Sequence, residues 1–192
     1  MKQADEILAF WLDELGPDGW YRADKALDNE IRDRFEFTWE RSQVGACGLW
    51  LTDPAGALAY IIVTDQFPRN IYRDDARAFA SDKAARAAAK VAIDREWDRA
   101  ISEPARQFFY MPLMHSESLT DQDRAVRLIM SRLPQGRTLQ LPHAQAHRDI
   151  IRKFGRFPER NDALNRRATA PEVIYTQAGG YDFTLKSLAA SS

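Results

Sequence analysis

Two segments of the chain carry the same polar residues directly after an apolar run, and these residue types could bind an anion. The first segment reads Asp65-Gln66-Phe67-Pro68-Arg69-Asn70, and the second reads Phe154-Gly155-Arg156-Phe157-Pro158-Glu159-Arg160-Asn161. The planar guanidinium fork of arginine matches carboxylate and phosphate, and asparagine adds both a donor and an acceptor. Proline stops a regular helix, so each Arg-Asn pair is expected where the chain changes direction. The pattern predicts either two halves of one polar site or two halves of one structural clasp.

The ligand-binding hypothesis uses the arginines and the amides of both segments. Arginines gathered at two loops of a nearly neutral chain favour a small anionic ligand over a nucleic acid. The residues expected to bind it are Gln66, Arg69, Asn70, Arg156, Arg160 and Asn161. The alternative is structural, with Asp65 and Arg69 locking the helix end as a buried ion pair and Asn70 satisfying loop backbone.

Histidines near carboxylates suggest acid–base chemistry. His115 and Glu117 follow Pro112 two residues apart, and His147 lies in the apolar helix before the second segment. A histidine beside a carboxylate can act as a general base, so we consider His115, Glu117, Asp65 and His147 as candidate catalytic residues. The alternative for His115 is a helix C-terminal cap, where an imidazolium complements the helix dipole.

Other kinds of catalytic site have less support in the spacing. The same histidines and carboxylates have the ligand types for iron, zinc or manganese, but no two of these four residues are spaced as a His-x-x-x-His or Glu-x-x-His pair. Ser116 lacks the setting of a nucleophile elbow, and Cys47 has no evident base nearby. We therefore assign no metal ligands, and the sequence identifies no cofactor.

The composition predicts a soluble cytoplasmic protein. The chain has 192 residues, of which 45% are hydrophobic, and its 27 basic and 28 acidic residues give a net charge of −1. No general field attracts nucleic acid or an acidic membrane. The lone cysteine fits a reducing compartment, and the acidic N-terminus is unlike a secretory signal. No apolar run approaches the roughly 20 residues that cross a bilayer.

The apolar periodicity is helical nearly throughout, with no convincing alternating strand. We expect helices over about 5–15, 25–43 and 77–93, with others opening near 53, 102, 120, 143 and 169. In helix 25–43, an apolar residue recurs every four positions and Arg32 falls on the outer face. Residues 133–142 are expected to form a loop, and Gly155 to cap a helix. The predicted fold class is all-α: one domain over residues 1–192, with about eight helices packed as hairpins and a weakly ordered tail over 178–192.

Several blocks, in this order, resemble the bacterial domain-of-unknown-function family 924. They are Leu58-Ala59-Tyr60-Ile61-Ile62 with Asp65 to Ile71, Ala78-Phe79-Ala80-Ser81-Asp82, Met111 to Glu117, Asp121-Gln122, and His147 to Pro158. The resemblance spans about residues 5–175 and implies an all-helical, tetratricopeptide-like fold, with no established activity. The chain departs from the family pattern at Glu159, where a histidine is usual, and at Asn165, where a glycine is usual.

Two functional hypotheses follow from these patterns. The first is a cytoplasmic helical protein with a pocket for a small anionic molecule, with acid–base or hydrolytic activity left open. The second is a non-catalytic interaction module, whose groove accepts a peptide or partner helix and whose Phe-Pro-Arg-Asn turns are structural. An open pocket lined by these polar residues would favour the first, and arginines engaged in internal ion pairs would favour the second.

Overall fold

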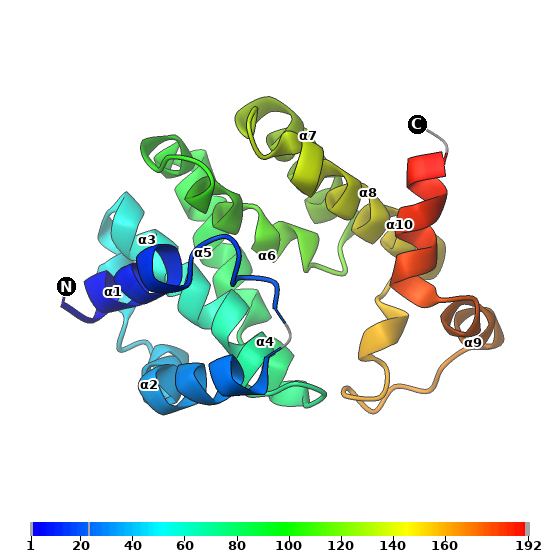
Figure 1. Cartoon of the computed structure of the whole chain (residues 1–192), viewed down its shortest axis with the longest axis horizontal. Coiled ribbons are helices and arrows are strands. Elements are labelled where there is room, and N and C mark those ends of the chain that lie inside the picture. Colours follow the sequence, from blue (N-terminus) through cyan, green and yellow to red (C-terminus); the bar gives the residue numbers. More distant parts are fainter. Residues whose placement is uncertain (1, 23, 191–192) are drawn as a thin grey trace. The chain divides into compact units, whose positions relative to one another are not determined.

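The regular secondary structure in the described part of the chain is all helical. The computed structural model describes residues 2–22 and 24–190, and every regular element within them is a helix (Figure 1). The all-α prediction is confirmed. The chain divides into two compact units, Met1–Pro112 and Leu113–Ser192, so the expectation of one domain stays a prediction. In the described ranges, no helix is both long and apolar enough for a membrane span.

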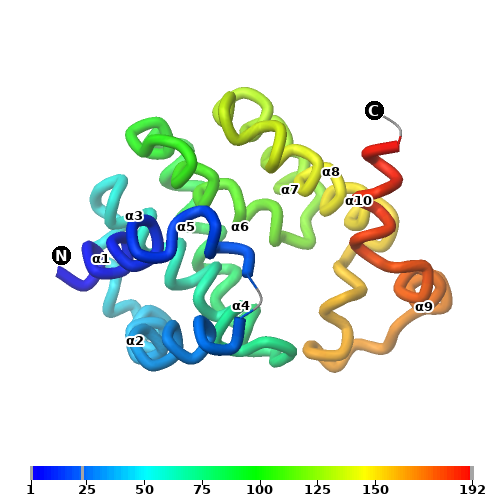
Figure 2. The backbone as a smooth tube through the Cα atoms, in the orientation of Figure 1, coloured from blue at the N-terminus to red at the C-terminus, as the bar shows by residue number. Residues whose placement is uncertain are grey.

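The first unit is a succession of helices and short turns, which Figure 2 follows from blue to green. Its α-helices are α1 (Lys2–Leu8), α2 (Lys25–Gln43), α3 (Pro54–Ile61), α4 (Phe67–Ile71) and α5 (Asp82–Asp94), and α6 (Met111–Met114) crosses into the second unit. π-Helical turns η1 (Ala9–Leu15) and η3 (Ile62–Gln66) extend α1 and α3. The 3-10 turns are η2 (Gly48–Thr52), η4 (Ala76–Phe79), η5 (Trp97–Ala100) and η6 (Ala105–Phe109).

Aromatic side chains form the centre of this unit. Phe35 of α2 stacks on Phe67 with ring centroids 4.9 Å apart, and Phe10 and Trp11 pack edge-on against Phe67 at 6.3 and 5.4 Å. All four side chains are buried. Burying one ring of this size stabilises a fold by roughly 1.5–3 kcal/mol. The four-residue apolar spacing that predicts α2 places Phe35 in this core.

The first proline segment does not stop its helix, so the prediction of a helix end is wrong here. Before the proline, η3 widens the helix, and the Phe67 N–H bonds to the Ile62 carbonyl five residues back. Pro68 has no N–H to give to the Thr64 carbonyl, the partner that an α-helix would require. The Ser81 hydroxyl donates to that carbonyl instead, at 2.6 Å. The helix therefore continues as α4.

The second unit contains α7 (Leu119–Arg132), α8 (Arg137–Phe154), η7 (Pro158–Arg160), α9 (Ala170–Gln177) and α10 (Gly180–Ala190). Here the proline segment does end a helix. Gly155 caps α8 with a φ of 71°, and Phe157 is extended before η7 begins. Glycine adopts this positive φ at little cost, so the predicted cap at Gly155 is confirmed. The extra glycine in the second segment explains why the two segments differ.

Several helix boundaries differ from expectation. α8 begins at Arg137 and contains Pro142, so most of the loop predicted over 133–142 is helical. α7 begins at Leu119, without a side-chain cap. The segment predicted to be a weakly ordered tail forms α10 as far as Ala190, and residues 191–192 lie outside the described residues. By contrast, a helix opens near residue 169 as predicted, and Thr169 and Glu172 form a capping box at the start of α9.

Candidate functional site

The first predicted segment lies in η3 and α4, and its charged residues pair with neighbours in the first unit. Arg69 Nη1 lies 2.9 Å from Asp82 Oδ1 and 3.6 Å from Asp65 Oδ1. The same nitrogen donates to the Asp65 carbonyl at 2.7 Å and to the Ala78 carbonyl at 3.4 Å. Gln66 Nε2 donates to Asp65 Oδ2 at 2.5 Å. Arg69 therefore joins η3 to η4 and to the start of α5.

The surroundings of Arg69 favour a structural role. Burial opposes its positive charge, but the carboxylates of Asp65 and Asp82 outweigh burial and raise the pKa of Arg69. Its other terminal nitrogen, Nη2, is buried without a hydrogen bond. With one terminal nitrogen engaged and the other enclosed, Arg69 presents no fork to a ligand from solvent. These contacts fit the clasp alternative better than ligand binding.

Asn70 points to a different group, the buried carboxylate of Asp28 on α2. Asn70 Nδ2 donates to Asp28 Oδ1 at 2.9 Å, and Arg73 donates to both carboxylate oxygens at 2.5 and 2.9 Å. Burial works against the charge of Asp28, but the hydrogen bonds from Arg73 and Asn70 outweigh it and lower the pKa of Asp28. Asp28 therefore stays ionised at neutral pH and holds Asn70 and Arg73 in place.

A basic hollow opens beside Asn70. It has a volume of about 270 Å³ and is bounded by the first two turns of α2 and the end of α4. Three cationic side chains and two amides line it, against one carboxylate: Lys25, Arg32, Arg73, Asn29, Asn70 and Asp28. Its excess of positive charge favours a small anion.

Most of this lining was not predicted from the sequence, although a signal was present. Lys25, Asp28, Asn29 and Arg32 are spaced i, i+3, i+4 and i+7, which places them on one face of α2. Arg32 was expected to face solvent, yet it donates to the Ile71 carbonyl of α4 and to Asn29 Oδ1. The polar face of α2 therefore packs against α4 at this point.

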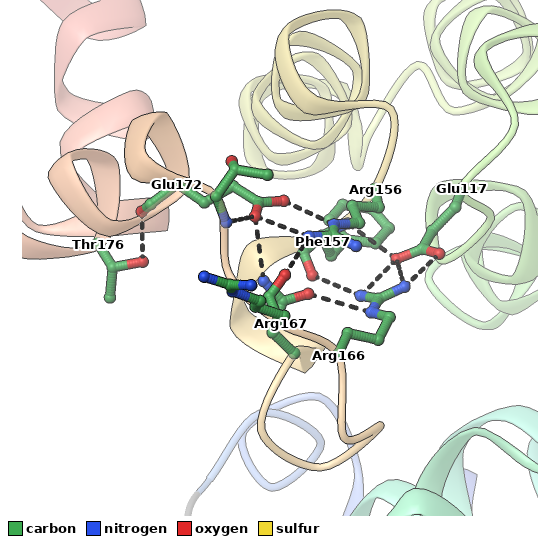
Figure 3. A network of polar contacts seen from close by, with 9 residues as sticks. Glu117, Arg156, Phe157, Arg166, Arg167, Glu172 and Thr176 are labelled. Carbon is green, nitrogen blue, oxygen red and sulfur yellow. Dashed lines mark hydrogen bonds and ion pairs between the residues drawn. The ribbon is translucent and has the colours of Figure 1, made fainter.

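The second predicted segment lies at the end of α8 and in η7, and its polar groups form the network in Figure 3. Arg156 binds Glu172 of α9 through two hydrogen bonds of 2.6 and 2.8 Å, and donates to the Arg167 carbonyl at 2.9 Å. Asn161 Nδ2 lies 3.4 Å from the same carboxylate. The hydrogen bonds from Arg156 and from the Thr169 backbone lower the pKa of Glu172 to about 2. Arg156 and Asn161 therefore fasten η7 to α9.

Glu117 belongs to the same network. It accepts the Phe157 N–H at 2.8 Å and hydrogen bonds of 2.8 to 3.0 Å from Arg166, which the site prediction omitted. Burial opposes the charge of Glu117, but the bonds from Arg166 and the Phe157 N–H outweigh it and lower its pKa. A carboxylate held in this way is a weak base and a strong anchor.

The candidate histidines lie together in the second unit. The rings of His115 and His147 are 6.3 Å apart, and His147 also packs against Phe157 and Tyr181 at 5.4 and 5.1 Å. Arg160 Nη2 donates to the His115 carbonyl at 2.9 Å. Among the residues that the structure describes, no group of three or more His, Cys, Asp or Glu side chains is arranged to hold a metal ion.

The predicted residues are divided between the two units. Asp65, Gln66, Arg69 and Asn70 belong to the first unit, and His115, Glu117, His147, Arg156, Arg160 and Asn161 belong to the second. Each group is described within its own unit, so a pocket shared by both segments stays a prediction. Within both groups, arginines are engaged with internal carboxylates or carbonyls.

Comparisons with known proteins agree with the resemblance seen in the sequence. The model of a family described as "Bacterial protein of unknown function (DUF924)" matches residues 7–180. A solved structure of a protein of unknown function, ATU0120 from Agrobacterium tumefaciens, is 40% identical, with a TM-score of 0.87 over 93% of this chain and 98% of that chain. No curated protein matches the chain.

The clasp assignment predicts that Arg69 matters for stability. Replacing Arg69 with alanine leaves the Asp65 carboxylate buried without its cation, and we expect the free energy of unfolding to fall by about 3 kcal/mol. Urea denaturation of the full chain measures this. Arg77→Ala is the matched control, because Arg77 pairs with Asp75 on the surface and such a pair contributes at most about 1 kcal/mol. Equal, small losses for both variants would contradict the clasp.

The Glu172 network predicts a defined pH dependence. Glu172→Gln keeps a capping side chain at the start of α9 but removes the charge that binds Arg156. The folded-state pKa lies below the ordinary value of 4.5, so the charge stabilises the fold above pH 4.5 and this contribution is lost as the pH falls toward 2. The variant should therefore be less stable than wild type at pH 7, with the gap closing toward pH 2. A gap that is constant with pH would show that the charge is irrelevant.

Proposed function

The chain belongs to the DUF924 family of bacterial proteins, and we propose that it binds a small anionic molecule in the basic hollow between α2 and α4. The observation that carries the proposal is the charge balance of the lining, three cationic side chains against one carboxylate. The anion expected is a phosphate or carboxylate, because the ammonium group of Lys25 and a guanidinium group suit both. Arg32 and Arg73 also bind protein groups, Arg32 through its two terminal nitrogens and Arg73 through Nε and Nη2, which leaves Arg32 Nε and Arg73 Nη1 for a ligand.

The size and construction of the hollow support a small ligand. Its volume of about 270 Å³ is below that of a typical pocket for a drug-sized molecule. Asp28 holds Asn70 and Arg73 in place beside the hollow, and Lys25 is an exposed residue of its lining. A ligand that binds here gives up contacts between its charge and water, and it gains contacts with donors that the protein already holds in position.

Catalysis receives less support than binding. The lining of the hollow contains no histidine, cysteine or serine, and its carboxylate is held ionised by Arg73. In favour of the predicted acid–base residues, the rings of His115 and His147 lie 6.3 Å apart. Against them, the carboxylate of Glu117 is bound by Arg166. We therefore restrict the proposal to binding, in a cytoplasmic protein as the composition predicts.

The second hypothesis, a helical interaction module, is favoured by a different observation. The arginines of both segments are engaged internally, as that hypothesis expects, and apolar hollows flank α9 in the second unit. The two functions involve separate surfaces, so each is tested on its own residues.

Reversing the charge of Lys25 tests the anion site. Lys25→Glu leaves two cations against two carboxylates in the hollow, so we expect the affinity for inorganic phosphate to fall by about tenfold or more at low ionic strength. Calorimetric titration of the full chain with phosphate measures this. The fold should be unaffected, because Lys25 is exposed in the first turn of α2, where an acidic residue is favourable.

The matched control is Lys83→Glu, which makes the same change in the first turn of α5, also at an exposed position. Wild type and this control should bind phosphate equally, and added salt should weaken both. Absence of saturable phosphate binding to wild type would overturn the proposal. Equal losses in the two variants would show that only net charge matters.

A further inference from the structure

Two apolar hollows adjoin on the surface of the second unit. One, of about 200 Å³, is lined by Asp149, Ile150 and Phe154 of α8 and by Thr184 and Ser187 of α10. The other, of about 370 Å³, is lined by Pro171, Ile174 and Ala178 of α9. Both share Lys153, Tyr175 and Phe183. We call this pair of hollows the α8–α10 groove.

The groove exposes large apolar side chains. Ile174 is 67% exposed and Phe183 is 51% exposed, although neighbouring Tyr175 is buried in the core cluster of this unit. Side chains of this kind that gather around one depression mark interaction surfaces, whereas single exposed apolar residues do not. The groove therefore has the apolar centre that a partner segment would cover.

Lys153 is the cationic residue of the groove. Its Nζ lies 5.1 Å from the ring centre of Phe154 and 5.6 Å from that of Tyr175, so the ammonium group stands over the aromatic wall. Lys153 is exposed, and within residues 24–190 no carboxylate forms an ion pair with it. Asp149 lines the same hollow four residues earlier on α8, and its carboxylate pairs with Arg148 and Arg152 instead. The cation is thus available to a carboxylate of a partner.

We infer that the α8–α10 groove binds an amphipathic helix of another protein, with two apolar side chains in the hollows and a carboxylate on Lys153. Two residues four positions apart on a helix have Cβ atoms about 5–6 Å apart, which suits two depressions that share a wall. The shared wall is formed by Tyr175 and Phe183, and Lys153 borders both depressions. Helix-in-groove recognition uses this combination of apolar anchors and a flanking charge.

A synthetic helical peptide tests the inference. The probe is an alanine- and glutamine-based helix with leucines at positions i and i+4 and glutamate at i+3, titrated into the isotopically labelled full chain. We expect NMR shifts at Lys153, Tyr175 and Phe183. Ile174→Ser should weaken binding by about tenfold, the effect of losing one apolar contact. Leu139→Ser is the matched control, because Leu139 is 62% exposed on α8 and lines neither hollow, and it should bind like wild type.

A charge exchange tests the role of Lys153. The Lys153→Glu variant should bind the glutamate peptide about fivefold more weakly than wild type does. The same variant should bind better to a peptide that carries lysine in place of glutamate. Shifts scattered outside the groove, or equal effects of Ile174→Ser and Leu139→Ser, would overturn the inference. Self-association of the free protein that Ile174→Ser abolishes would overturn it in favour of a second copy of this chain. None of these outcomes bears on phosphate binding at α2, so the two proposals fail separately.

Discussion

Internal pairing of arginine is the interaction on which both proline segments depend. Where a helix is widened or broken, its carbonyls lose their usual N–H partners, and buried carbonyls need a donor. Arg69 supplies one to the Asp65 carbonyl while binding Asp82, and Arg156 supplies one to the Arg167 carbonyl while binding Glu172. Each guanidinium therefore satisfies backbone and carboxylate together, which a lysine could not do with the same geometry.

This use of arginine determines where a ligand can bind. A guanidinium whose nitrogens are bound to carboxylates and carbonyls, or enclosed like Arg69 Nη2, has little left to offer an anion. The positive charge available to solvent lies instead on exposed lysines next to these clasps, at Lys25 in the first unit and at Lys153 in the second. We propose a small anion as the ligand of the basic hollow, and the α8–α10 groove combines one such charge with apolar surface. Function is thus expected beside the repeated motif, and the motif itself supports the fold.

The sequence predicts local structure well wherever one residue decides the outcome. Periodicity predicts the bounds of α2, and the freedom of glycine to adopt a positive φ predicts the cap at Gly155. A side chain that can cap a helix predicts the start of α9 at Thr169. The continuation through Pro68 could not be predicted, because it depends on a π-helical turn and on the Ser81 hydroxyl from a distant turn. The basic hollow could not be predicted for a similar reason. The spacing of Lys25 and Arg32 fixes a helix face, but only tertiary packing shows that α4 borders this face. Glu117 was predicted as a candidate catalytic residue, and its partner Arg166 could not be predicted because it lies 49 residues away.

The most direct measurement compares the arginines with one another during a single phosphate titration. In the NMR spectrum of the arginine side chains, the Nε–Hε signal of Arg32 should shift as phosphate binds, because the hydrogen bonds of Arg32 to Asn29 and Ile71 use its terminal nitrogens. The signals of Arg69 and Arg156 should stay in place, because their partners are Asp82 and Glu172. Movement of the Arg69 or Arg156 signals while that of Arg32 remains fixed would show that the repeated motif is the binding site, and would contradict this account.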